Sequence, residues 1–252
     1  MIEHAIRKTS KAVIPYITAG LPDLDTTGEI IEALSGAGAA AIEIGLPFSD
    51  PMADGPVLQK ASHMALGAGF TMEAFNAHLR DWSSSVAVPL IIMSYINPIM
   101  RHGVDKTLKG FAEAGIQGVI IPDLPSDGRE VFDLCDSIGI DLIRLVAPTT
   151  TQKRQQEVVS QCSGFVYAVS VKGVTGARQN LPEEVSSQVQ RIKSMTDLPV
   201  CVGFGISTAE QVSDMLAFAD GVIVGSFLME RIMNASDPAS AAREAFAGLM
   251  CA

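Results

Sequence analysis

The chain of 252 residues is 48% hydrophobic and carries a formal net charge of −10. This length suits one large α/β domain, and an acidic surface disfavours binding to nucleic acid or to anionic membranes. No apolar run reaches the ~20 residues that span a bilayer, and the N-terminal residues lack the apolar segment of a signal peptide. We therefore expect a cytoplasmic protein that does not contact membranes.

Cysteine and histidine spacing indicates neither disulfides nor a metal site. The four cysteines are far apart and form no CxxC pair, and the four histidines lack the spacing of metal ligands. We expect the cysteines to be reduced thiols and the chain to hold no metal.

Short apolar runs rich in β-branched residues alternate with amphipathic segments along the chain. The eight runs lie at 12–18, 39–45, 89–94, 118–121, 141–146, 165–169, 199–203 and 221–224. The amphipathic segments lie at 25–35, 71–83, 105–114, 126–138, 151–160, 182–195, 208–217, 226–235 and 238–250. Continuously apolar strands are typical of a parallel sheet that is buried on both faces. Eight strand–helix units predict a (β/α)8 TIM barrel, which we expect to occupy residues 1–252 as a single domain.

The longest connection between predicted strands follows the run at 39–45 and places two carboxylates close together. Glu43 lies inside that apolar run, where burying a charged carboxylate costs free energy. Asp54 lies in the following loop, which on this fold reaches the C-terminal face of the barrel. The two side chains together would suit acid–base chemistry. The structural alternative is that Glu43 forms a salt bridge and Asp54 caps a turn.

Aromatic residues gather at the ends of the predicted strands. Tyr16, Tyr95 and Tyr167 lie in or just after three strands, and Phe48 and Phe204 follow two others. Such side chains at one mouth predict a pocket for a flat apolar ligand. For each of them alone, ordinary core packing is the alternative.

Three glycine-rich turns lie where TIM barrels bind phosphate. They are 203–207 after the seventh strand, Gly225 and Ser226 after the eighth, and 173–177 after the sixth. A helix N-terminus offers free N–H groups to an anion there.

The absence of certain nucleophiles and motifs excludes further classes of reaction. None of the lysines lies in a predicted strand, which disfavours an imine-forming aldolase or a pyridoxal enzyme. The chain also lacks GxSxG. Carboxylate acid–base chemistry on a phosphorylated substrate remains.

Several motifs resemble the tryptophan synthase α subunit family over essentially the whole chain. The longest is Glu43-Ile-Gly-Leu-Pro-Phe-Ser-Asp-Pro-Met-Ala-Asp-Gly-Pro56, and the others lie at 15–20, 122–125, 147–149, 173–178 and 203–207. The resemblance implies retro-aldol cleavage of indole-3-glycerol phosphate to indole and D-glyceraldehyde 3-phosphate, a lyase step of tryptophan biosynthesis.

The resemblance also implies residue roles. Glu43 would shuttle the proton, and Asp54 would face the indole nitrogen. The implied substrate contacts are Tyr16, Tyr167, Thr175, Gly176, Phe204, Gly205, Gly225 and Ser226. No cofactor is implied in this chain.

A partner is implied as well, a β subunit that carries pyridoxal phosphate in an α2β2 complex. The loop 46–56 begins with Leu46, Pro47 and Phe48, which we expect to form an exposed apolar tip that docks this partner. The loop around 95–99 would join the interface, and Pro47 and Asp50 would be its contacts.

Two rival functions remain open. One is a phosphate-binding isomerase or epimerase barrel, and the other is a barrel without activity that serves only a partner. The segment before the first strand is shorter than is usual in the family, which bears on how the barrel floor is covered.

Overall fold

The computed structural model describes residues 1–125, 128–170, 181–203 and 205–251. Eight parallel strands close into a barrel, in which sequence neighbours pair and the last strand pairs with the first. They are β1 (Val13–Thr18), β2 (Ile42–Gly45), β3 (Leu90–Met93), β4 (Gly118–Ile120), β5 (Asp141–Val146), β6 (Val166–Val169), β7 (Val200–Gly203) and β8 (Gly221–Val224). The predicted (β/α)8 architecture and all eight predicted strands are confirmed.

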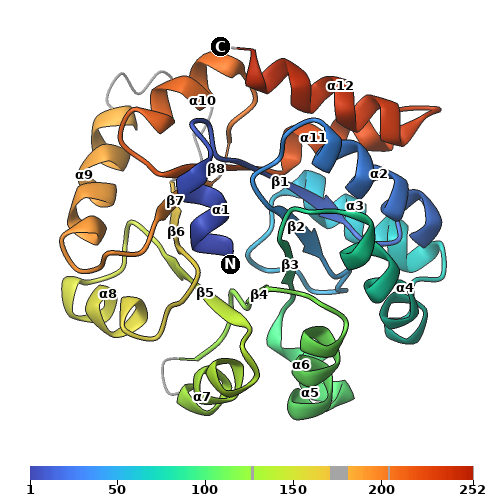
Figure 1. The fold of residues 1–252 in the computed structure, drawn as a ribbon, viewed down its shortest axis with the longest axis horizontal. Helices are drawn as coiled ribbons and strands as arrows, with labels where there is room; N and C mark the ends of the chain where they lie inside the picture. Colours follow the sequence, from blue (N-terminus) through green and yellow to red (C-terminus); the bar gives the residue numbers. More distant parts are fainter. Residues whose placement is uncertain (126–127, 171–180, 204, 252) are drawn as a thin grey trace.

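Helices form a ring around the barrel (Figure 1). In the described residues they are α1 (Ile2–Lys8), α2 (Leu24–Gly36), α3 (Pro56–Gly67), α4 (Met72–Ser85), α5 (Ile96–His102), α6 (Val104–Glu113), α7 (Arg129–Ile138), α8 (Gln152–Val159), α9 (Leu181–Lys193), α10 (Ala209–Leu216), α11 (Ser226–Met233) and α12 (Pro238–Met250). The strands are buried on both faces between this ring and the barrel interior, as their continuous apolar sequences require.

Side-chain caps explain several helix starts. Asp23 accepts a hydrogen bond from Thr26 N at α2, and Thr71 accepts one from Ala74 N at α4. At α10, Thr208 and Gln211 form a reciprocal capping box. Each cap satisfies an N–H group that has no partner within its helix.

Three helices were not predicted from the sequence. In α3 the buried side chains are the small Ala61, Ser62 and Ala65, which give no strong apolar periodicity. In α5, Pro98 falls in the first turn, where a missing N–H is tolerated, so the proline does not begin a loop. The third is α1.

The short α1 covers the floor of the barrel. Ile2 and Ile6 are buried, and the Ile2 side chain occupies the space that a Cβ on Gly118, at the start of β4, would need. Figure 1 shows α1 over the middle of the ring, across the strand starts. The segment before β1 therefore covers the end of the barrel opposite the C-terminal ends of the strands.

Candidate active site

A cavity of about 290 Å³ opens at the C-terminal ends of the strands. Seven predicted site residues line it: Tyr16, Glu43, Asp54, Tyr167, Gly205, Gly225 and Ser226. The three others, Thr175, Gly176 and Phe204, lie outside the described residues, as does the predicted phosphate turn 173–177. Register explains part of the convergence, because Tyr16 on β1 pairs with Glu43 on β2 and both therefore face the interior.

Glu43 is a buried carboxyl group at the floor of this cavity. Its side chain is 3% exposed, and among the described residues its Oε2 has no hydrogen-bond partner. Burial, and then the charge of Asp54, raise the pKa of Glu43 to about 8. At neutral pH the group is therefore mostly protonated and able to donate a proton. The ion pairs of the described residues do not include Glu43, so the salt-bridge interpretation is wrong for that part of the chain.

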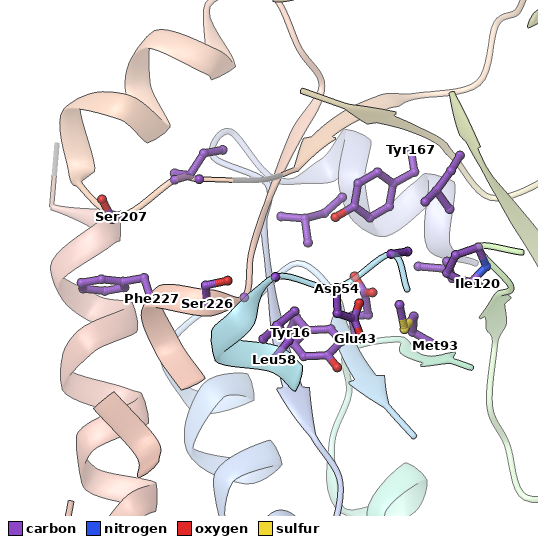
Figure 2. Close-up of a pocket in the computed structure, with 18 of the residues that line it drawn as sticks. Tyr16, Glu43, Asp54, Leu58, Met93, Ile120, Tyr167, Ser207, Ser226 and Phe227 are labelled. Atoms are coloured by element: carbon purple, nitrogen blue, oxygen red, sulfur yellow. The ribbon is translucent and has the colours of Figure 1, made fainter. Parts of the chain in front are cut away.

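Asp54 lies beside Glu43, on the loop that follows β2 (Figure 2). Asp54 N donates to Pro51 O at 3.1 Å, and Gln59 Nε2 donates to Asp54 O at 2.9 Å. Burial raises the pKa of Asp54 to about 6, while hydrogen bonding from the Tyr95 hydroxyl opposes that rise. Near neutral pH, Asp54 is therefore mostly ionised while Glu43 is mostly protonated, which divides the roles of base and acid between two similar groups.

Two tyrosines form walls of the cavity, and each lies against a glycine. A Cβ on Gly45 would overlap the Tyr16 hydroxyl, and a Cβ on Gly203 would overlap the Tyr167 hydroxyl. Burial raises the pKa of both phenols, so both stay neutral. The glycines at the ends of β2 and β7 therefore make room for the tyrosine rings.

Phe48 and Tyr95 were predicted at the mouth but are not among the described residues that line the cavity. Their rings contact each other instead, with centroids 5.2 Å apart. The predicted exposed tip is also wrong, because Leu46 and Pro47 are buried and Phe48 is only partly exposed. The large apolar side chain that this loop exposes is Met52, at 85%.

The far side of the cavity suits an anion. Ser226 and Phe227, in the first turn of α11, line it together with Ser207 (Figure 2). The N-cap of α11 is Gly225, which has no side chain to occupy the first N–H groups. These N–H groups and the helix dipole favour negative charge. Gly205 has a φ of +75°, which permits the turn that leads there.

Other lining residues were missed from the sequence. They include Leu58, Met93, Ile120, Leu145, Ile223, Phe227 and Glu230. Those on strands could have been found by continuing the alternation that places Tyr16 and Glu43 inward. Leu58 on α3 and Phe227 and Glu230 on α11 carried no such signal.

No group of His, Cys, Asp or Glu side chains in the described residues could hold a metal ion. Nor does the described chain contain a helix with the length and apolar character needed to cross a membrane. The site thus consists of the neighbouring Glu43 and Asp54 carboxyl groups, aromatic and apolar walls, and a helix N-terminus, with the Glu230 carboxyl group also in the lining.

Comparison with known proteins gives the family. The model of the "Tryptophan synthase alpha chain" family matches residues 2–249. A relative of that name from Carboxydothermus hydrogenoformans is 52% identical over 225 residues, covering 89% of this chain and 84% of its own. One from Bacillus cereus is 42% identical over 234 residues, covering 92% and 91%.

Solved structures agree. The tryptophan synthase A-subunit of Pyrococcus furiosus superposes with a TM-score of 0.88 at 33% identity, over 95% of this chain and 98% of that one. Tryptophan synthase from M. tuberculosis gives 0.85 at 33% identity, over 98% and 97%. On this similarity of sequence and fold, the chain belongs to the tryptophan synthase alpha chain family.

Proposed function

We propose that Glu43 and Asp54 catalyse the lyase reaction of this family, the cleavage of indole-3-glycerol phosphate to indole and D-glyceraldehyde 3-phosphate. One observation carries the assignment: two carboxyl groups with pKa values of about 8 and about 6 meet in one apolar-walled cavity. We also propose that residues 1–252 act as a single domain.

The reaction needs a proton donor before it needs a base. Indole cannot leave as a carbanion, so protonated Glu43 first transfers its proton to indole C3 and forms an indolenine. Ionised Asp54 stabilises the positive charge that develops on the ring nitrogen. The Glu43 carboxylate then takes the proton of the adjacent glycerol hydroxyl as the carbon–carbon bond breaks. Its bonding electrons return to the ring, the aldehyde forms, and Glu43 is protonated again.

We propose one orientation of the substrate in this cavity. The indole lies among Tyr16, Tyr167 and Leu58, close to the carboxyl groups. The phosphate lies at Gly205, Gly225 and Ser226, and Figure 2 shows Ser226 on the side of the cavity away from Tyr167. Thr175, Gly176 and Phe204 complete the proposed contacts. This geometry puts the apolar part against apolar walls and the dianion at a helix N-terminus.

We further propose a partner, a tryptophan synthase β subunit that carries pyridoxal phosphate, in an α2β2 complex in the cytoplasm. A solved neighbour at TM-score 0.88 is the tryptophan synthase complex of Pyrococcus furiosus. Met52 on the loop after β2 and Met100 on α5 are exposed at 85% and 61%, which suits an apolar interface. Asp50 is exposed close to Met52, so we propose that it contacts the β subunit. Pro47 is buried, so we do not propose it as a contact.

The test is an indole assay on the purified chain with indole-3-glycerol phosphate. Glu43→Gln keeps the size of the side chain but cannot shuttle a proton, so indole formation should fall by at least ~10²–10⁴-fold. Asp54→Asn should also be severe. The matched control is Glu29→Gln on the exposed face of α2, which should behave like the wild type.

Each rival function predicts a different result. An isomerase or epimerase would consume substrate without releasing indole. A barrel without activity would release no indole with or without its partner. Near-normal indole formation by a folded Glu43→Gln variant would refute the assignment of Glu43.

A further inference from the structure

The hydroxyl of Tyr95 lies against the segment that carries Asp54. Ala53 N donates a hydrogen bond to Tyr95 Oη at 2.9 Å, and Ala53 directly precedes Asp54. Hydrogen bonding between the Tyr95 hydroxyl and the Asp54 side chain lowers the pKa of Asp54 and raises that of Tyr95. The Tyr95 hydroxyl thus binds the loop backbone at Ala53 and lies close enough to the neighbouring Asp54 side chain to influence its charge.

The chemistry of a phenol determines which group donates and which accepts in these hydrogen bonds. A phenol has one proton to donate and oxygen lone pairs that accept. Because the oxygen accepts from Ala53 N–H, the phenolic proton remains for the Asp54 carboxylate. A hydrogen bond of this kind, to an ionised acceptor, is stronger than one between neutral groups.

Tyr95 itself is held firmly. Its side chain is 3% exposed and packs against the Phe48 ring. It follows β3 as the N-cap of α5, and the next residue, Ile96, donates its N–H to Asp123 Oδ1 at 2.8 Å. The hydroxyl is therefore presented from a barrel strand end and not from the loop that it contacts.

We propose that Tyr95 is a positioning residue for Asp54: its hydroxyl ties the loop at Ala53 to the end of β3 and aims the Asp54 carboxylate into the cavity. The inference rests on the proposed function of Asp54. Tyr95 does not itself line the cavity among the described residues, so it acts through Asp54 and not on the substrate.

The charged state of Asp54 depends on the hydroxyl of Tyr95. The ionisable groups that interact with the Asp54 charge are Glu43 on β2, Tyr16 on β1, Tyr167 on β6 and Tyr95 itself. Burial disfavours the charge of Asp54, and of these groups Tyr95 is the one whose hydrogen bonding lowers its pKa. Loss of the hydroxyl should leave a carboxylate that is both less well oriented and protonated at higher pH.

The experiment compares Tyr95→Phe with Phe48→Leu. Tyr95→Phe removes the hydroxyl and keeps the ring contact, whereas Phe48→Leu removes the ring contact and keeps the hydroxyl. Indole formation is measured against pH for both variants and the wild type. Separately, the Asp54 carboxyl carbon is titrated by ¹³C NMR without substrate, and its signal is assigned by its loss in Asp54→Asn.

For Tyr95→Phe we expect kcat to fall by about 10- to 100-fold, as for the loss of a hydrogen bond to a charged group, with little change in KM. The acid limb of the rate profile and the NMR titration of Asp54 should both move to higher pH. Phe48→Leu should lower thermal stability without moving either titration.

An unchanged NMR titration of Asp54, or an unchanged kcat and acid limb, in folded Tyr95→Phe would overturn the inference. The NMR result does not depend on activity. A wild-type chain that forms no indole would instead overturn the proposed function, while the Tyr95–Asp54 contact would still be tested by the titration.

Discussion

Glu43 is placed where its ionised form destabilises the fold. Its pKa is about 8 in the folded chain, against 4.5 for a glutamate side chain that is not buried. Between these values the folded state binds more protons than the unfolded state. Stability that is fully present below about pH 4.5 is therefore lost progressively as pH rises through about 8. A side chain chosen for stability alone would not ionise there.

Glu43→Gln should accordingly be more stable than the wild type at alkaline pH. The amide has no charge to bury, so the difference between the two proteins should grow as pH rises from about 4.5 to about 8, level off above that, and amount to a few kcal/mol. Urea unfolding at several pH values measures it, with Glu29→Gln as the control for amide substitution on the surface. A difference that does not change with pH would mean that Glu43 titrates normally.

The rate of indole formation should show a bell-shaped dependence on pH. Asp54 must be ionised, so the rate falls as pH drops through about 6. Glu43 must be protonated, so the rate falls as pH rises through about 8. Measuring kcat/KM across this range checks both limbs, which report the pair and not two isolated groups. A rate that still climbs past about pH 9 would contradict the role of Glu43 as proton donor.

At this scale, residue chemistry made part of the site predictable. Glu43 could be singled out because burying a carboxylate in an apolar strand costs free energy. Asp54 could be singled out because it lies in the long loop that follows that strand. The ring contact between Phe48 and Tyr95 was not predictable, because it depends on how the loop folds back onto β3. The hydroxyl contact of Tyr95 with Ala53 N has the same origin.

At the scale of the elements, β1 and β2 contact each other closely where Tyr16 meets Gly45. The Tyr16 ring extends over Gly45, so the backbone of β2 leaves room for the cavity wall. Glycine is needed at position 45 for lack of space and not for its backbone conformation, because its φ angle is not in the left-handed region.

Gly45→Ala should therefore be strongly destabilising and should reduce activity, since the methyl group and the Tyr16 ring cannot both be accommodated. Overpacking of this kind typically costs ~1–3 kcal/mol. The loss should be smaller in a Tyr16→Leu background, and a double-mutant cycle by urea unfolding measures that coupling.

Gly36→Ala is the control for the substitution itself. Gly36 ends α2 with open space around it, and alanine favours helix there by up to about 1 kcal/mol. Equal losses for Gly45→Ala with and without Tyr16 would show that the ring is not the obstacle.

Across the whole molecule, the barrel was predictable because its strands are buried on both faces. A strand that is buried on both faces must be apolar along its whole length. The eight apolar runs can therefore be recognised in the sequence without knowing how their side chains pack. The helices α1, α3 and α5 were not predictable in the same way. They are short or bury small side chains, and their place depends on the barrel they cover.

The loop after β2 links the active site to the outer surface of the molecule. Its buried start leads to exposed Asp50 and Met52, and Asp54 follows two residues later. Through Ala53 and Tyr95 the same loop is tied to the start of α5, and Met100 is exposed further along that helix. A partner that covers these methionines would restrict the backbone that carries the catalytic carboxylate.

Titrating a tryptophan synthase β subunit into the indole assay should therefore raise turnover. Coupling between sites is typically ~1–3 kcal/mol, or roughly 5- to 150-fold. Met52→Ser should weaken binding of the β subunit by removing an exposed apolar contact, and Asp50→Ala should reduce activation. Met64→Ser is the matched control, because Met64 is an exposed methionine on α3, outside this loop. Turnover that stays constant at saturating β subunit, with Met52→Ser binding like the control, would show that the partner does not act through this loop.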